Sequence, residues 1–281
     1  MVFVLGADIY ASLEGNWHDG SRAPYEAEIS QHLAQRYNKL ELAHLDLHQV
    51  AQQWIEAKGN VELMRELRRI LGKNYPASQL HQFICSLGEH SQYRDYHPVI
   101  LTYTLDDVMV RSFEGRKRAF DVFKPSPKDK CYIHSHFDGE AWQHKAVTDP
   151  NKYDYQVGQR PIIIKIKGYF EGSRDSQMLI SEDDHLLSFS ENLLNKLPAS
   201  VLGKLRQDSC FLFLGLGLDR WHYRGIFKQI WQDKERKNLL ESWAVQRQAD
   251  SFNQKIWENH NVNWLDSDLS YFINRLESAL S

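Results

Sequence analysis

The chain has 281 residues, of which 42% are hydrophobic and 25% charged, and its formal net charge is -3. These values are ordinary for a globular protein, and a chain of this length buries roughly three quarters of its unfolded surface without disulfides or metals. The small negative charge provides no field for gripping a phosphate backbone, which argues against direct nucleic-acid binding.

The N-terminus and the cysteines indicate a cytoplasmic protein. The apolar run Met1 to Leu5 lacks the basic leader, the length and the cleavage site of a signal peptide. No run approaches the ~18 apolar residues that a membrane helix needs. Cys85, Cys131 and Cys210 are an odd, widely spaced set, which predicts reduced thiols. We therefore expect neither secretion nor membrane insertion.

The first third of the chain reads as one strand followed by helices. Val2 to Leu5 is a short apolar run that ends at Gly6 and Ala7, which predicts a buried strand turning into a loop. Four segments with apolar residues at helical spacing follow, over residues 27–36, 47–55, 61–71 and 80–87. We interpret residues 23–90 as an inserted helical block of about three hairpin-joined helices.

The middle of the chain adds a strand, a helix and hairpins. Residues 99–104, introduced by Pro98, predict a buried strand, and residues 105–114 predict a helix. Asp106 and Asp107 would lie in its first turn, where carboxylates complement the helix dipole. Short apolar and aromatic runs over 119–147 are broken at residues 125–127 and 138–139, which predicts a β-hairpin insertion.

The apolar run at residues 161–166 anchors the rest of the chain. It ends at Gly168 and predicts a parallel strand covered on both faces. A short strand over 177–180 and a helix capped reciprocally by Ser181 and Asp184 should follow. Further helices are expected over 186–194, 201–206, 221–231, 250–258 and 269–280, and strands over 210–218, 242–246 and 262–265. This alternation predicts an α/β fold with a doubly wound parallel sheet, in a single domain over residues 1–281.

Several loops that leave apolar strands are candidate nucleotide-binding elements. Glycines at strand ends let a backbone approach a phosphate, and in open α/β sheets such ends converge on one crevice. The absence of G-x-G-x-x-G argues against an ordinary Rossmann dinucleotide site, and a glycine at a strand end is often only a turn. The candidate cofactor-binding residues are Gly6, Ala7, Asp8, Thr102, Asp106, Gly168, Gly215 and Gly217.

The order of these features resembles the sirtuin-like family of bacterial anti-phage NAD hydrolases. The resemblance rests on the segments at residues 4–9, 101–107, 161–168, 180–185 and 211–221, which stand where the family has its phosphate loop, its Thr-Thr-Asn-Tyr-Asp motif, its Lys-x-His-Gly strand, a Thr-Glu-Asp-Asp-Tyr helix start and a Phe-Leu-Gly strand. It implies a sirtuin-like, Rossmann-like fold, an NAD or ADP-ribose-type nucleotide, and a place in bacterial defence.

The departures from the family motifs concern catalysis. The resemblance places Thr104 where the family has the Asn that orients the attacking water, and Lys167 where it has the His base. Threonine lacks the amide carbonyl, and a lysine with a pKa near ~10.4 cannot accept a proton at neutral pH unless desolvation lowers that pKa by several units. Asp8 and Tyr10 also bring a carboxylate and a bulky ring to the phosphate loop.

The departures predict a catalytically degenerate module. It would bind a nucleotide or a partner protein within a defence assembly, or form a homo-oligomer, with no cofactor certain. The alternative is an active NAD glycohydrolase that depletes NAD, in which His185 or His136 supplies the base.

A second alternative is a zinc-dependent hydrolase. His134, His136 and Asp138 have the H-x-H-x-D spacing, with His144 and Cys131 nearby, and alternation would place both histidines on one strand face. Asp138 and Gly139 are also a good turn, and the resembled family has no metal there, so we expect none.

The helix over residues 221–231 is rich in aromatic residues. Trp221, Tyr223, Phe227 and Trp231 lie around much of its circumference. Such a helix packs into a core or supplies an interface.

Overall fold

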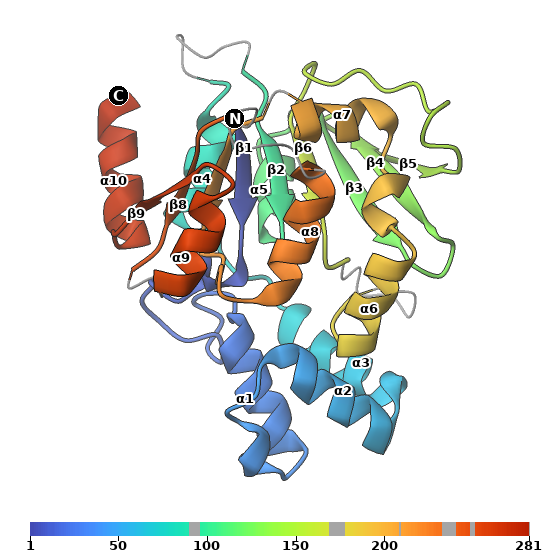
Figure 1. Ribbon diagram of the computed structural model, residues 1–281, viewed down its shortest axis with the longest axis vertical. Coiled ribbons are helices and arrows are strands. Elements are labelled where there is room, and N and C mark those ends of the chain that lie inside the picture. Colours follow the sequence, from blue (N-terminus) through green and yellow to red (C-terminus); the bar gives the residue numbers. More distant parts are fainter. Residues whose placement is uncertain (90–95, 169–177, 208, 232–239, 248–250, 281) are drawn as a thin grey trace.

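The computed structural model describes residues 1–89, 96–168, 178–207, 209–231, 240–247 and 251–280. Within these ranges, nine strands form one sheet in the order β5-β4-β3-β6-β2-β1-β7-β8-β9 (Figure 1). The pairs β3 with β4 and β4 with β5 are antiparallel, and the other pairs are parallel. The predicted α/β fold with a doubly wound, mostly parallel sheet is confirmed.

The central strands are fully buried because both of their faces are covered. Successive residues of a strand point to opposite faces, and Phe3 and Leu5 of β1 accordingly pack into one core while Val2 and Val4 pack into the other. The parallel strands are β1 (Val2–Leu5), β2 (Val99–Thr102), β6 (Ile162–Lys165), β7 (Phe211–Leu214), β8 (Ser242–Val245) and β9 (Val262–Leu265).

Helices form a layer on each face of the sheet. One layer comprises α4 (Gln79–Ser86), α5 (Val108–Glu114) and α10 (Leu269–Leu280), and its buried cluster is shared by α1 (Glu26–Arg36), α2 (Leu47–Lys58) and α3 (Asn60–Leu71). The other comprises α7 (Ala199–Gln207), α8 (Trp221–Trp231) and α9 (Ser251–Glu258). Helix α6 (Glu182–Ser190) contacts both α2 and α8. Short 3₁₀ helices are η1 (Ala7–Tyr10), η2 (Leu40–Leu42) and η4 (Leu193–Lys196).

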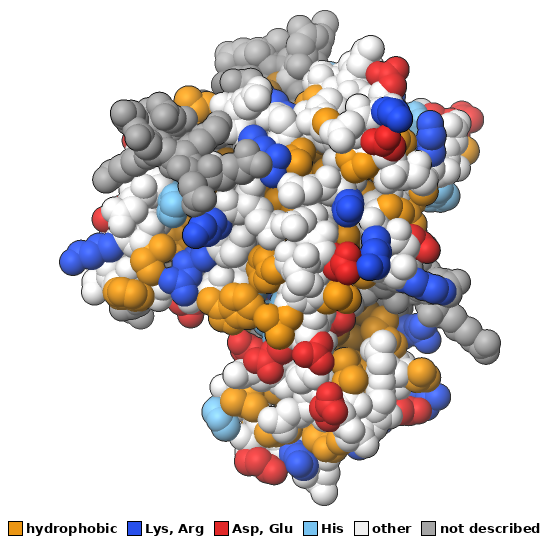
Figure 2. Space-filling view, turned by 45° about the vertical axis from the view of Figure 1, so that its right-hand side comes forward, with side chains coloured by type: hydrophobic (Ala, Val, Ile, Leu, Met, Phe, Trp, Pro, Cys, Tyr) orange, Lys and Arg blue, Asp and Glu red, His pale blue; other side chains and the backbone are white. Residues whose placement is uncertain are grey.

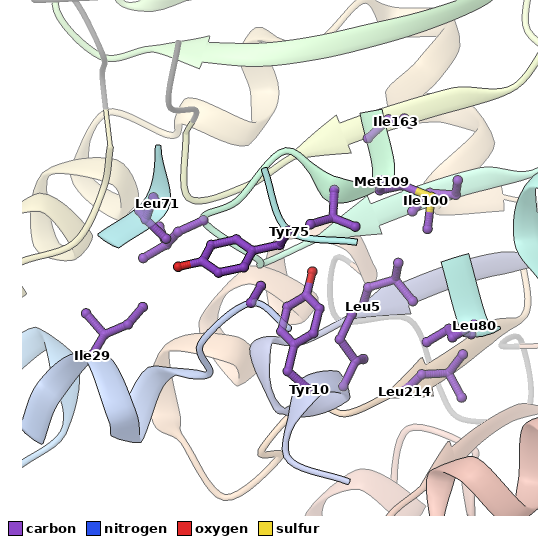
Figure 3. Close-up of a cluster of buried hydrophobic side chains, with 14 of the residues drawn as sticks. Leu5, Tyr10, Ile29, Leu71, Tyr75, Leu80, Ile100, Met109, Ile163 and Leu214 are labelled. Carbon is purple, nitrogen blue, oxygen red and sulfur yellow. The ribbon is translucent and has the colours of Figure 1, made fainter. Parts of the chain in front are cut away.

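Four helices, α1 to α4, occupy the block in which the sequence predicted about three. Helices α1 to α3 lie beyond the carboxyl ends of the central strands, at the bottom of Figure 1, and the same block forms the lower part of the molecule in Figure 2. Figure 3 shows Tyr10 and Tyr75 between strand residue Leu5 and block residues Ile29 and Leu71. All five belong to one buried cluster, so the block and the sheet share a core.

The strands of the predicted hairpin segment extend the main sheet. They are β3 (Phe120–Ser126), β4 (Cys131–Phe137) and β5 (Trp142–Val147). Strand β3 pairs in parallel with β6, and β5 forms an edge of the sheet. The predicted break at residues 125–127 is wrong in part, because Pro125 and Ser126 belong to β3. The predicted turn at Asp138 is confirmed, since its Oδ1 accepts the amides of Glu140 and Ala141 at 2.9 and 2.8 Å.

Helix starts differ from prediction in two places. Helix α5 begins at Val108, so Asp106 and Asp107 precede its first turn, and Asp106 Oδ1 accepts the Val108 amide at 2.9 Å. Helix α6 begins earlier than predicted, at Glu182, and has the predicted reciprocal cap of Ser181 and Asp184.

The short strand predicted over 177–180 is reduced to one bridge between Met178 and Gly168. Its residue 177, and residue 250 of the predicted helix over 250–258, lie outside the described ranges.

The three cysteines are free thiols, and Cys85 and Cys131 are buried. Burial raises the pKa of the Cys85 thiol to about 12, which keeps it protonated and unreactive. Within the described ranges, no helix combines the length and apolar character needed to cross a membrane.

Candidate functional site

Two glycines let the loops after β1 and β7 touch. The Gly6 amide donates to Leu214 O, and the Asp8 amide donates to Gly215 O, both at 3.0 Å. A Cβ added at Gly6 would lie 2.0 Å from Gly215 O, and one at Gly215 would lie 2.3 Å from the Ile9 nitrogen. Gly215 also has a φ of +60°, which side chains rarely adopt. Both positions therefore require glycine, and they hold two strand ends in contact.

A pocket of about 300 Å³ opens beside these loops, and we call it the glycine pocket. Three predicted residues, Asp8, Gly215 and Gly217, line it. The ends of β8 and β9 supply polar groups that sequence reasoning missed, among them Gln246 and Arg247. The remaining lining residues are Ala11, Ser12, Leu216, Val245, Ser267, Asp268 and Leu269.

Gln246 is the most informative of the missed residues. Its side-chain oxygen Oε1 is buried and has no hydrogen-bond partner among the described residues. A buried unsatisfied carbonyl costs free energy unless a ligand or water donates to it. The only sequence signal was its place directly after the apolar strand β8.

The carboxyl group of Asp8 should repel a bound phosphate less strongly than an exposed aspartate would. Burial raises its pKa, against the attraction of the nearby Arg220 and Lys167 cations. The carboxyl group therefore protonates more readily than an exposed aspartate. Its oxygens can also accept hydrogen bonds from ribose hydroxyls.

Lys167 lies in a buried ion cluster. It follows β6 by two residues and is 1% exposed. Its Nζ pairs with Oε1 of Glu26, from the first turn of α1, and Arg220 Nη1 pairs with the other Glu26 oxygen. Lys167 Nζ also lies 5.5 Å from the centroid of the Tyr223 ring. No sequence pattern connected Glu26 with this place.

Burial makes Lys167 an unusual lysine. It lowers the pKa of the ammonium group to about 7, although the carboxylates of Asp46 and Asp8 act in the opposite direction. The desolvation that could turn a lysine into a base is thus present. The same side chain is held by Glu26 in a site closed to solvent.

Three buried histidines surround this cluster from α2, α6 and α8. The ring centroids of His48 and His185 are 4.2 Å apart, those of His48 and His222 are 4.4 Å apart, and those of His185 and His222 are 4.8 Å apart. Burial lowers the pKa of His48 to about 3 and that of His185 to about 2, and the charge of Lys167 adds to both shifts. The rings are therefore neutral at pH 7. His185, the predicted alternative base, lies here.

Thr104 and Lys167 follow adjacent strands. The Ile166 amide donates to Thr102 O at 2.9 Å, so the chains leaving β2 and β6 run side by side. Thr104 is 4% exposed, and its Oγ1 lies 2.9 Å from Thr102 Oγ1. Tyr103 between them stacks edge-on with Tyr223, with centroids 4.8 Å apart. The threonine hydroxyl is thus engaged inside the protein.

Three other predicted residues belong to the scaffold beside the pocket. Asp106 is buried and accepts the Tyr10 hydroxyl at 2.9 Å, and burial raises its pKa. Ala7 is buried in η1. Gly168 has a φ of +86°, which favours glycine, and it forms a bridge with Met178.

The zinc interpretation loses its ligand set. His134 Nε2 and His136 Nδ1 each lie 2.8 Å from Oδ1 of Asp121, a residue outside the predicted set. Asp138 is used by its turn. Among the described residues, no group of three or more His, Cys, Asp and Glu side chains is arranged to hold a metal ion. His136 also lies on β4, at the hairpin, and not beside Lys167.

The aromatic helix α8 packs mainly inward. Tyr223, Phe227 and Trp231 are buried, whereas Trp221 is half exposed. Three of the four aromatic residues therefore serve the core.

The comparisons with known proteins agree with this architecture. The sequence pattern of the SIR2-like domain matches residues 98–265, which include β2 to β9, Lys167 and Gln246. The match begins after the helical block, so Glu26 and Asp8 lie outside it. The search of curated proteins gave no match. Because the matched segment covers more than half of the chain and the sheet has the expected Rossmann-like form, the chain belongs to the SIR2-like domain family.

Proposed function

We propose that this protein is a catalytically degenerate SIR2-like module that binds an ADP-ribose-type nucleotide in the glycine pocket without effective hydrolysis of NAD. The observation that carries the proposal is the buried ion cluster. Lys167 stands where the resembled family has its base, and Glu26 and Arg220 enclose it.

The chemistry of the cluster opposes catalysis. Lys167 is held by Glu26 in a site closed to solvent, so its amine is not free to approach a ribose hydroxyl and take its proton. Thr104 has its hydroxyl engaged with Thr102 and lacks a carbonyl to orient water. Loss of one positioned acid-base group costs ~10²- to 10⁴-fold in rate, and here two positions are changed.

The glycine pocket supports nucleotide binding. The glycine backbones after β7 can approach a ligand closely, and Arg247 brings a cation to the same lining. Gln246 Oε1 and the Asp8 carboxyl group can accept hydrogen bonds from ribose hydroxyls or from an adenine amino group. In open α/β sheets, ligands bind beyond the carboxyl ends of the strands, which is where the glycine pocket lies.

The first prediction tests binding and hydrolysis together. Calorimetric titration with ADP-ribose should give saturable binding to the unmodified protein, and Gln246→Leu should weaken it about tenfold or more, because a buried acceptor is lost. Nicotinamide release from NAD should stay at background.

Gln53→Leu, at an exposed position of α2, is the matched control and should bind like the unmodified protein. Silent titrations would refute the nucleotide role, and NAD turnover that disappears in Lys167→Met would refute the degenerate one.

An active NAD glycohydrolase is the second candidate, and the lowered pKa of Lys167 favours it. In that case a conformation that separates Lys167 from Glu26 would free a neutral amine as the base. Lys167→Met would then abolish nicotinamide release, whereas Glu26→Gln would raise it.

We also propose that the protein acts in a cytoplasmic bacterial defence assembly, with a partner protein or with its own copies. Family resemblance supplies the defence context. Leu186, Leu187 and Trp221 are exposed apolar side chains of α6 and α8, and Figure 2 displays hydrophobic atoms beside acidic ones where the helical block meets the body. Light scattering of the unmodified protein and of Leu187→Glu would test self-association.

A further inference from the structure

A second pocket lies at the hairpin end of the sheet, and we call it the hairpin pocket. It measures about 550 Å³ and is lined by residues of β4, β5 and the segment before β6. It lies at the opposite end of the strands from the glycine pocket, because Asp121 beneath it pairs with Ile162, the first residue of β6. It is separate from the glycine pocket and from the ion cluster around Lys167.

A buried carboxylate forms the floor of this pocket. Asp121 is 0% exposed, and four side chains meet it. His134 Nε2 and His136 Nδ1 lie 2.8 Å from its Oδ1, while the Tyr155 hydroxyl and Arg160 Nε lie 2.7 Å from its Oδ2. Burial alone would raise the pKa of Asp121, but the hydrogen bonds from His134 and Tyr155 hold it below its usual value. The carboxylate is therefore ionised.

The carboxylate fixes the direction in which its neighbours face. His136 donates its Nδ1 proton to Asp121, so its Nε2 points away from the floor. Arg160 forms an ion pair with Asp121 and lines the pocket, so its guanidinium is held at the floor. His134 is fully used, because its Nδ1 also bonds the Tyr153 hydroxyl at 2.8 Å. Side chains locked in this way form a preorganised site.

Lys145 completes the pocket from the neighbouring strand. It stands directly opposite His134 in the register of β4 and β5, and its Nζ lies 5.0 Å from the centroid of the Tyr153 ring. The pocket lining thus includes a guanidinium, an ammonium and an imidazole, from Arg160, Lys145 and His136. Its carboxylate floor is neutralised by the donors that cover it.

We propose that the hairpin pocket binds the phosphate group of a small phosphorylated molecule. The terminal nitrogens of Arg160 can form paired hydrogen bonds with phosphate oxygens, and Lys145 adds a point charge. The volume lies within the range of small-ligand sites, and Tyr153 offers a ring face to the organic part of the ligand.

Phenyl phosphate is the probe that tests this proposal. It should bind the unmodified protein saturably, with Kd between about 10 μM and 1 mM, and it should shift the imidazole NMR signals of His134 and His136. Lys145→Met should raise Kd at least tenfold. The matched control is Lys152→Met, at a lysine that is 86% exposed and pairs with Asp149 outside the pocket; its Kd should not change.

His136→Gln is the second variant, and it should also weaken binding, with an unchanged urea midpoint as the check on folding. Equal Kd values for the unmodified protein and Lys145→Met would overturn the proposal. So would shifts confined to Gly217 and Gln246, because the probe would then occupy the glycine pocket. Phenyl sulfate and benzoate are the comparison ligands, and equal binding of benzoate would overturn the assignment to phosphate.

Discussion

The pairing of Lys167 with Glu26 places two opposite charges together in the protein interior. Removing either partner of such a buried pair leaves an uncompensated charge and typically costs ~3–5 kcal/mol, whereas the intact pair adds little net stability. The cluster is therefore better understood as a constraint on charge than as a source of stability. Any ligand chemistry at Lys167 must first displace Glu26.

Lys167 should give the protein a recognisable pH dependence. Its pKa is about 7 in the folded protein, against an ordinary value of 10.5. Between these values the unfolded chain binds more protons than the folded one, so this group makes the free energy of unfolding rise with pH from about 7 towards 10. Urea unfolding at pH 7, 8 and 9 should show the rise.

Lys167→Met is the variant for comparison, because methionine fills a similar volume without a titrating group. The rise between pH 7 and 9 should be smaller in this variant. Identical slopes for the two proteins would mean that Lys167 keeps its proton throughout. The comparison cancels the contributions of other groups that titrate in both.

Sequence reasoning reached Lys167 but could not reach Glu26. The apolar run at residues 161–166 marks a strand, and the residue at its end is a candidate because ligands bind there. Glu26 is 141 positions away in the sequence, and it lies just before the helix predicted over residues 27–36, where no pattern marked it. Only the packing of α1 across the strand ends brings the two together.

At the scale of elements, the contact between the loops after β1 and β7 is the tightest requirement. Gly6→Ala would place a Cβ 2.0 Å from Gly215 O, and the obstacle is backbone, which cannot move without shifting β7. We expect a loss of several kcal/mol or no folded protein, in the range of strongly destabilising changes. Urea unfolding measures the loss.

Gly203→Ala in α7 is the matched control. Apart from the adjacent residues and the helix's own backbone, no atom lies within 4 Å of a Cβ added there, and alanine favours helices over glycine by about 1 kcal/mol. This variant should be as stable as the unmodified protein or more so. A Gly6→Ala protein of normal stability would show that the two loops separate easily.

Element types could be predicted more fully than their partners. Strands β1, β2, β6 and β7 are continuous apolar runs because both faces are buried, and this pattern was visible in the sequence. The pairing of β3 with β6 could not be predicted from the sequence. Alternating apolar residues in a hairpin indicate which face of a strand is buried, but they do not indicate which strand lies next to it. Asp121 consequently escaped notice, although it organises four side chains.

The helical block and the sheet should unfold together. Their side chains form one buried cluster, and separating them would expose much apolar surface at a cost of roughly 25 cal/mol per Å². We expect a single cooperative transition in urea, with coincident curves from circular dichroism and tryptophan fluorescence.

Trp54 is buried in the helical block, so Trp54→Phe removes a fluorescence signal of the block and leaves that of the sheet layers. The remaining tryptophans include Trp231 and Trp257 on the far layer. If the block unfolds first, the fluorescence curves of the variant and the unmodified protein will differ in midpoint, and the single-unit prediction will fail.

Strand β5 is one edge of the sheet, and its side chains determine whether another strand can pair with it. Strand β5 has the exposed side chains Gln143, His144 and Lys145 along its middle. Polar and charged groups on a terminal strand discourage a foreign strand from adding its backbone there. We therefore expect that copies of the protein do not pair through β5 to form a continuous sheet. The exposed polar side chains would protect this edge strand from fibre formation although no other element that the structure describes covers it.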